Sequence, residues 1–272
     1  MAERALFEAV IVAMRPIHDL LFIVALASLR LTVAFALLPP MGSTFLRGFT
    51  RQGLITLIAL FIAVGVPVDV FHRLGFFEIL GHVAKEAMIG LMMGYAGSQV
   101  FWAAQSVGAY IDTQAGFNSV QLTNPLSGQQ STPVSDLLLN LVVVIFFSLG
   151  GMLVFLGAVF DSFHAWPLLS PFPEWSKVGD LFVIDQTASL MTVVVKFAAP
   201  MLVILMLIDL GFGFVTRSAS KLEVSALSQP VKGAVAVLML ALMTATLVDQ
   251  VRDLLLPTGL LGQVKAALGA SH

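Results

Sequence analysis

The sequence contains no cysteine and little charge, and these absences narrow the class of protein. With no Cys in 272 residues, the chain has neither a disulfide framework nor a thiolate site. Charged residues make up 11% of the chain and the net charge is −2, which gives no reason to expect nucleic-acid binding. Only 2 Tyr and 3 Trp stand beside 21 Phe, so the aromatic belts of a lipid-exposed membrane protein are weak.

The motifs of catalysis and metal binding are also missing. The five His residues fall in separate segments without metal-ligand spacing: His18, His72, His82, His164 and His272. Neither an H-E-x-x-H motif, a G-x-S-x-G nucleophile elbow nor a P-loop occurs in the sequence. We therefore expect no enzymatic activity, no metal and no cofactor, with any nucleotide hydrolysis supplied by another protein.

Long apolar runs recur from one end of the chain to the other. With 58% hydrophobic residues, they predict a single all-α, polytopic membrane domain over residues 1–272. Six hydrophobic spans are expected, at residues 17–38, 53–68, 79–107, 137–160, 188–215 and 231–255. The mixed charged and apolar residues 1–16 favour a separate interfacial helix.

The charges of the connecting segments orient these spans. Arg47 and Arg51 follow the first span, whereas residues 160–187 hold four acids against Lys177 alone. The positive-inside rule then places the first connection in the cytoplasm and residues 160–187 in an external, periplasmic loop.

One connection, residues 108–136, is neither apolar nor charged. Its interior carries a single charge, Asp112, and is otherwise rich in Gly, Ser, Thr, Asn and Gln. Lipid offers no partners for so many backbone and amide groups. The segment is therefore expected to be irregular backbone that protein shelters or that lines a polar cavity, and it is the first candidate for function.

Three charges stand within or beside the apolar spans. Arg30 lies in the middle of the first span, where a charge costs roughly 2.5–3.5 kcal/mol on insertion scales. Asp19 or Asp209 is expected to pair with it, either as a buried ion pair that joins helices or as part of a transport pathway. Lys85 and Glu86 point about 100° apart on a helix, so they are expected to meet separate subunits or loops, or to flank the membrane.

Small residues along the third span predict close packing of helices. Gly90 and Gly94 form a small-xxx-small pair that lets a neighbouring backbone approach.

Taken together, these stretches resemble the SctT/FliR family, the export-gate subunits of type III secretion systems and of the bacterial flagellum. The resemblance runs from about residue 15 to 255, and it rests on Arg30 with Pro39-Pro40, Lys85-Glu86 with Gly90 and Gly94, Gly108-x-x-Ile111-Asp112-x-Gln114-x-Gly116, Asn124-Pro125, Gly150-Gly151, and Asp161-Ser162-Phe163 with Pro167. Residues 124–128 and 162–167 are more similar to the injectisome branch than to the flagellar branch.

The resemblance implies an architecture and partners. Family members pack as helical hairpins with SctR/FliP-like and SctS/FliQ-like subunits, next to a SctU/FlhB-like switch protein. Together they form a helical pore in the inner membrane of Gram-negative bacteria, through which unfolded secreted proteins pass. The loop that matches residues 116–133 lies in that pore as a plug.

Site residues follow from the same resemblance. The implied plug residues are Gly116, Phe117, Asn118, Val120, Leu122, Asn124 and Pro125. Asp112 and Gln114 are the implied anchor of the loop, and Arg30, Lys85 and Glu86 are implied subunit contacts or buried charges.

Other interpretations remain open. The loop can be a static structural connection between subunits. The chain can be a small-solute secondary transporter that uses Arg30, Asp19 and Asp209, although the paired broken helices typical of transporters are not detected. An intramembrane enzyme ranks third, because the sequence shows no nucleophile–base pair.

Overall fold

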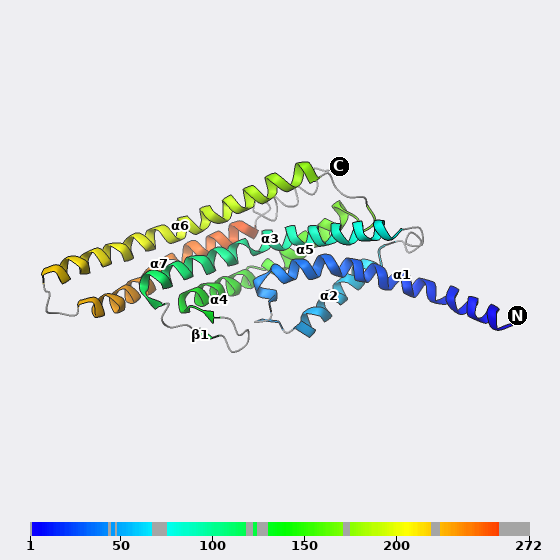
Figure 1. Cartoon of the computed structure of the whole chain (residues 1–272), viewed down its shortest axis with the longest axis horizontal. Helices are drawn as coiled ribbons and strands as arrows, with labels where there is room; N and C mark the ends of the chain where they lie inside the picture. The colour runs from blue at the N-terminus through cyan, green and yellow to red at the C-terminus, as the bar shows by residue number, and fades with distance from the viewer. Residues whose placement is uncertain are drawn as a thin grey trace. The chain divides into compact units, whose positions relative to one another are not determined.

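The computed structural model describes residues 2–42, 45–46, 48–66, 75–117, 122–123, 130–170, 175–218 and 224–255 of the chain. These residues are almost entirely helical (Figure 1). The elements in chain order are α1 (Ala2–Leu37), the short 3₁₀ helix η1 (Pro39–Met41), α2 (Gly48–Ala63), α3 (Phe76–Ala115), β1 (Leu122–Thr123), β2 (Gln130–Ser131), α4 (Pro133–Ser148), α5 (Gly151–Ala165), α6 (Trp175–Ser218) and α7 (Val224–Leu255). The predicted all-α class is confirmed, since the described residues contain only one pair of strands, of two residues each.

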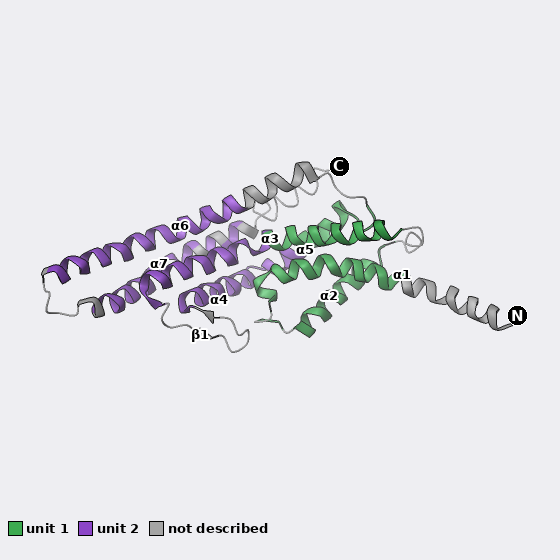
Figure 2. Cartoon of the chain, in the orientation of Figure 1, with its two compact units in different colours: residues 1–95, 158–175, 268–272 green, residues 96–157, 176–267 purple. Residues whose placement is uncertain are grey.

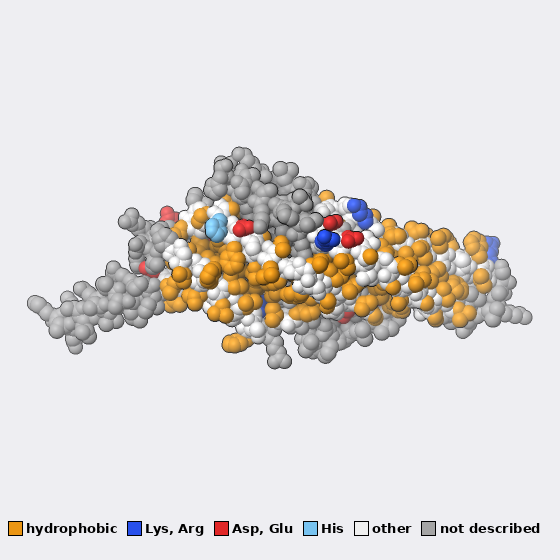
Figure 3. Space-filling model, turned by 180° about the vertical axis from the view of Figure 1, so that it is seen from behind, with side chains coloured by type: hydrophobic (Ala, Val, Ile, Leu, Met, Phe, Trp, Pro, Cys, Tyr) orange, Lys and Arg blue, Asp and Glu red, His pale blue; other side chains and the backbone are white. Residues whose placement is uncertain are grey.

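The described helices provide fewer membrane spans than the sequence predicted. By length and composition, three segments can cross a bilayer: residues 19–37, 187–217 and 227–253. The bent pair α4–α5 makes a fourth if it is one broken span. Helix α2, at 16 residues, is too short, and α3 is not among the candidates. The chain is an all-α polytopic membrane protein. On the face that Figure 3 shows, hydrophobic side chains cover much of the described surface.

A glycine explains why the expected span at residues 137–160 is broken. Helices α4 and α5 meet at an angle of 71°. Gly150 between them has φ +75°, a left-handed conformation that ends helices and that glycine adopts without strain. A Cβ on the next residue, Gly151, would lie 2.5 Å from the Phe146 ring, so the turn also needs a small residue there.

Three segments are more helical, or part of longer helices, than the sequence predicted: residues 1–16, 108–136 and 160–187. Helix α1 is continuous from Ala2, so residues 1–16 do not form a helix of their own. Helix α3 continues to Ala115 and α4 begins at Pro133, so both ends of residues 108–136 are helical instead of irregular. Helix α5 ends at Ala165 and α6 begins at Trp175, so most of residues 160–187 is helical rather than loop.

The chain divides into two compact units (Figure 2). Unit 1 holds residues 1–95, 158–175 and 268–272, and unit 2 holds residues 96–157 and 176–267. Within unit 1, α2 packs along α1, and the buried side chains include Ile23, Leu31, Phe35 and Ile89. Within unit 2, α4 packs against α7. There the rings of Phe101 and Phe146 meet edge to face at 5.2 Å.

The prediction of close packing at Gly90 and Gly94 is confirmed within unit 1. A Cβ on Gly90 would lie 2.4 Å from the carbonyl oxygen of Arg30, and one on Gly94 would lie 2.7 Å from that of Ala34. Both distances are shorter than real Cβ contacts. Glycine is therefore required on this face of α3, because the α1 backbone occupies the space that a side chain would need.

Replacing Gly90 by alanine should destabilise the protein. Because the new methyl group meets backbone atoms of α1, the helices must separate, at a cost of about 1–3 kcal/mol for an overpacked contact. Thermal unfolding of the purified protein in detergent measures the effect. Gly81→Ala on the same helix is the matched control, since a Cβ there meets nothing within 4 Å. Equal melting temperatures for the two variants would contradict the packing argument.

Candidate functional site

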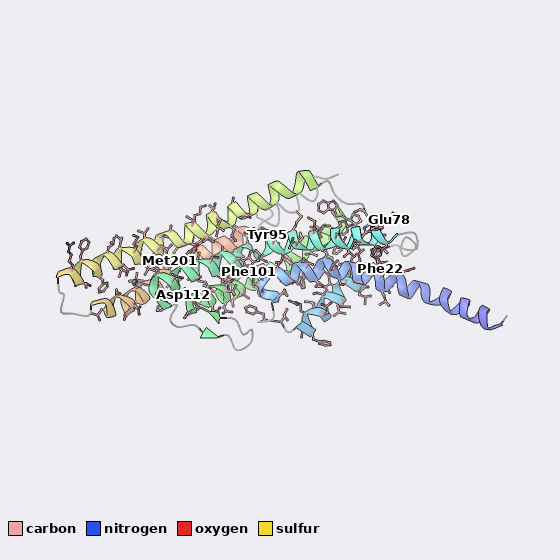
Figure 4. The ribbon with its side chains drawn as sticks, viewed as in Figure 1. Phe22, Glu78, Tyr95, Phe101, Asp112 and Met201 are labelled. Atoms are coloured by element: carbon pink, nitrogen blue, oxygen red, sulfur yellow. The ribbon has the colours of Figure 1, made fainter. Side chains whose placement is uncertain are left out.

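The two ends of the connection between α3 and α4 meet at a buried carboxylate in unit 2. Asp112 lies on the last turns of α3 (Figure 4). It is fully buried and accepts hydrogen bonds from the backbone N–H groups of Val134 at 3.1 Å and Ser135 at 3.0 Å. These are orphan donors of the first turn of α4, whose own N-cap, Thr132, makes no side-chain cap bond. Asp112 therefore caps α4 from another helix, where the helix dipole also favours negative charge.

Close backbone packing supports this junction. A Cβ on Gly108 would lie 2.4 Å from the Cα atom of Ser135, so α3 and the start of α4 touch backbone to backbone. The Ser135 hydroxyl donates to the carbonyl oxygen of Gln105 at 3.0 Å. Glycine at position 108 is what lets Asp112 reach the α4 amides.

The tip of α3 is held by a second group of polar residues, which we name the Gln114 cluster: Gln114, Asp209 and Lys232. Lys232 of α7 forms an ion pair with Asp209 of α6, with Nζ 2.7 Å from Oδ1. The side-chain amide of Gln114 donates to Asp209 Oδ2 at 3.1 Å. Lys232 Nζ also donates to the backbone carbonyl of Gln114 at 2.9 Å. One residue of α3 thus bonds to both partners of an α6–α7 ion pair.

Helix α7 also contacts the two residues that follow α3. Gly116 has φ +79°, and a Cβ there would lie 2.9 Å from the side-chain nitrogen of Gln229. The Phe117 ring packs against Gly233, where an added Cβ would lie 2.8 Å from Cζ. The chain leaves α3 through a conformation that suits glycine and lies directly on α7.

The remaining predicted plug residues are only partly within the described chain. Leu122 lies in β1, opposite Ser131 of β2, in a short antiparallel pair. Asn118, Val120, Asn124 and Pro125 lie outside the described residues.

A second site, in unit 1, surrounds Arg30. We name it the Arg30 cluster: Arg30 of α1, Lys85 and Glu86 of α3, Ser162 of α5, and the turn at residues 166–170. The Arg30 guanidinium binds Glu86 through two hydrogen bonds, from Nε at 2.7 Å and from Nη2 at 3.0 Å. It also donates to Ser162 Oγ at 2.9 Å and to the Trp166 carbonyl at 3.0 Å. Four of its five N–H groups are therefore engaged.

Lys85 binds the turn that follows α5. Its ammonium donates to the carbonyl oxygens of Pro167, Leu168 and Ser170 at 2.7, 2.9 and 3.2 Å. Cations are favoured at the negative, carbonyl-bearing end of a helix. Burial lowers the pKa of the Lys85 ammonium, and the Glu86 carboxylate opposes that shift.

The pairings differ from those that the sequence predicted. Neither Asp19 nor Asp209 pairs with Arg30. Asp19 lies eleven positions from Arg30 on the same helix, about 16 Å along its axis. Asp209 binds Lys232 instead. The expectation that Lys85 and Glu86 do not pair is also wrong, because Lys85 Nζ lies 3.3 Å from Glu86 Oε1. The long lysine side chain spans the 100° between the two positions. Both residues find partners in their own chain.

Sequence reasoning missed the roles of Ser162, Lys232 and the carbonyl groups at residues 166–170. Every residue has a backbone carbonyl, so residue type does not indicate which carbonyl groups bind a side chain. Lys232 did carry a signal, since it stands at the start of an apolar span as Asp209 stands near the end of another. Their positions mark both residues as charges that need a partner, but residue type does not say which partner.

The two clusters consist of contacts that join helices. Among the residues that the structure describes, no group of three or more His, Cys, Asp or Glu side chains can hold a metal ion. The acceptors and donors in both clusters are engaged with one another, which joins helices.

Comparison with known proteins finds relatives that match most of the chain. The profile of the "Bacterial export proteins, family 1" matches residues 21–257. The "Yop proteins translocation protein T" of Yersinia pestis is 31% identical over 214 residues, 78% of this chain and 82% of the relative. The "Flagellar biosynthetic protein FliR" of Bacillus subtilis is 26% identical over 88% of this chain and 93% of its own. The "Surface presentation of antigens protein SpaR" of Salmonella typhimurium is 28% identical over 83% and 84%.

Removing one partner of the Arg30–Glu86 pair should destabilise the protein more than removing both. Arg30→Met leaves Glu86 buried and without its bidentate partner, a loss of about 3–5 kcal/mol for a broken buried pair. Thermal unfolding of Arg30→Met, Glu86→Gln and the double variant measures this coupling. Arg217→Met, at an exposed cation near the end of α6, is the control. Additive effects of the two single changes would show that the pair is not coupled.

Asp112→Ala should expose the first turn of α4. Without the carboxylate, the Val134 and Ser135 amides lose their acceptor, at a cost of about 1–2 kcal/mol for a lost cap. Hydrogen exchange at the start of α4 should then accelerate by roughly tenfold, whereas Asp112→Asn, which keeps an acceptor, should change less. Unchanged exchange in Asp112→Ala would contradict the capping role.

Proposed function

The chain belongs to the bacterial export proteins of family 1, and from this we propose that it is a pore and gate subunit of a type III protein-export apparatus. Its relatives are named for translocation, flagellar biosynthesis and antigen presentation at the surface. Membership in a family of export proteins supports an export role. The gate is a finer inference, which rests on the segment between α3 and α4.

One observation carries the proposal: a segment without charge is held at its base by charged groups. Residues 118–131 contain no Asp, Glu, Lys or Arg. On the α4 side the base is fixed by Asp112, and on the α3 side by Asp209 and Lys232 acting on Gln114. A static connection of two helices needs neither this length nor two separate sets of polar restraints.

These properties suit a plug in a protein-conducting pore. A closed pore must exclude ions, which apolar side chains such as Phe117, Val120 and Leu122 can do by excluding water. An open pore must pass chains of varied sequence, so fixed charge in the plug would bind or repel some of them. Amide and hydroxyl groups provide hydrogen bonds without that selectivity, and Gly116 provides a point where the backbone can turn.

We propose that the chain works in a complex in the inner membrane of Gram-negative bacteria, with SctR/FliP-like, SctS/FliQ-like and SctU/FlhB-like subunits. The identity to a Yersinia translocation protein favours the injectisome branch. Large apolar side chains are exposed on several helices, among them Phe49 and Phe61 of α2, Leu153 of α5, and Leu242 of α7. Such surfaces suit lipid or the apolar helices of partner subunits.

The proposal assigns no catalysis and no solute transport. The charges that a transport pathway would use are bound to other groups, Arg30 to Glu86 and Asp209 to Lys232. The Arg30 guanidinium is fully buried, so it is not placed to bind and release a solute. The Arg30 cluster is instead proposed to stabilise the fold of the subunit.

Deleting residues 117–122 should make the closed pore conduct ions while the complex still assembles. The deletion removes the apolar side chains of the proposed seal and leaves Asp112 and Gln114 in place. Gly116→Asp should act in the same direction, because a charged side chain at φ +79° strains the backbone and meets Gln229. Ion flux into vesicles that carry the assembled apparatus measures the leak.

Gly157→Ala is the matched control for the glycine change, since a Cβ there meets nothing within 4 Å. Normal ion flux and normal secretion in a deletion variant that assembles would contradict the gate assignment. A structural connection would then be the better explanation.

A further inference from the structure

We infer that Asp209 and Lys232 are positioning residues of the gate: their ion pair holds Gln114, and with it the tip of α3, in the closed arrangement. The inference rests on the proposed function. It adds that displacement of α6 from α7 releases the segment after α3, which couples the gate to these two helices.

The geometry of the Gln114 cluster makes Gln114 depend on both charges at once. Asp209 Oδ1 binds Lys232 while its Oδ2 accepts from the Gln114 amide. Lys232 Nζ in turn donates to the Gln114 carbonyl. Each of the three residues therefore bonds to the other two. Moving either charge breaks the ion pair and one bond to Gln114 in the same step.

The position of the two residues in apolar helices favours the paired arrangement. Asp209 lies within the candidate span 187–217 and Lys232 within the span 227–253. A charge among apolar helices is costly without a counter-charge, so separation of the two helices is opposed. Two contacts extend the same hold along α7, Gln229 beside Gly116 and Gly233 beside Phe117.

The two ends of the segment between α3 and α4 are held with different strength. Asp112 is fully buried and bonds only to backbone amides of α4, so the α4 side stays in place. The Asp209 side chain is 40% exposed and that of Lys232 is 10% exposed, so solvent or headgroups can compete for this pair. Release is therefore expected on the α3 side, at Gly116, while α4 remains attached.

Exchange of the two charges distinguishes positioning of Gln114 from an ion pair that only joins α6 to α7. Asp209→Lys combined with Lys232→Asp restores an ion pair between α6 and α7. It also places a carboxylate against the backbone carbonyl of Gln114, so the bond that Lys232 donates to that carbonyl is lost. The variant should co-purify with its partner subunits yet leak ions, on the order of tenfold above the unmodified complex, as expected for lost bonds to charged groups.

Three further cluster variants and one control complete the experiment, each tested in the assembled complex in native-membrane vesicles. Asp209→Asn and Lys232→Met should raise ion flux by a similar factor. Gln114→Met, which removes the amide but preserves side-chain length, should raise it by about fivefold, the effect of one lost hydrogen bond. Lys196→Met, at an exposed cation of α6 outside the cluster, should leave flux unchanged.

Recovery of normal flux in the charge-exchange variant would overturn the inference, because the pair would then only join α6 to α7. Normal flux in Gln114→Met would overturn it as well, and this variant decides the matter if the single charge changes prevent assembly. A leak after deletion of residues 117–122, without a leak in the cluster variants, would reject the positioning role and keep the gate. Absence of a leak in the deletion variant would reject the proposed function itself.

Discussion

A polar group among apolar helices must find its partners inside the protein, and this constraint organises the described structure. Arg30 is fully buried, and four of its N–H groups bind Glu86, Ser162 and a backbone carbonyl. Asp112 is fully buried and binds two amides. In each case the partner belongs to a different helix, so satisfying the charge also fixes the packing.

The same constraint separates structural charge from charge that is available for motion. The Arg30 cluster is buried and its bonds are nearly saturated, so it resists rearrangement. The Gln114 cluster has the same kinds of groups, but its carboxylate is partly exposed and Gln114 depends on both of its charges. A gate needs both kinds of contact, because a rigid frame must hold a segment that can be released. Under the proposed function, this distribution lets one subunit be stable and still open.

Sequence patterns predicted the class of the protein well and the helix boundaries poorly. Apolar runs identified helices around residues 17–38, 188–215 and 231–255, since hydrophobicity alone suffices to predict them. They did not predict that α4 and α5 bend at Gly150, because a single glycine ends a helix only when the surroundings favour a left-handed residue. The polar content of residues 108–136 suggested irregular backbone, yet its first eight residues are helical. Asp112 can lie in α3 because its partners come from another helix.

The sequence by itself determined the all-helical membrane class, the glycines at which another helix can approach closely, and the presence of charges that require partners. These follow from residue type and spacing, which are local. Only the tertiary structure decided which charges pair, since Arg30 meets Glu86 instead of Asp19 or Asp209, and Asp209 meets Lys232 beside Gln114. Arg30 and Glu86 are 56 positions apart, and no periodic pattern in the sequence relates them. The same holds for Lys85 and the carbonyl groups that it binds. Their pairing depends on how helices pack, and packing is set by the whole set of buried contacts.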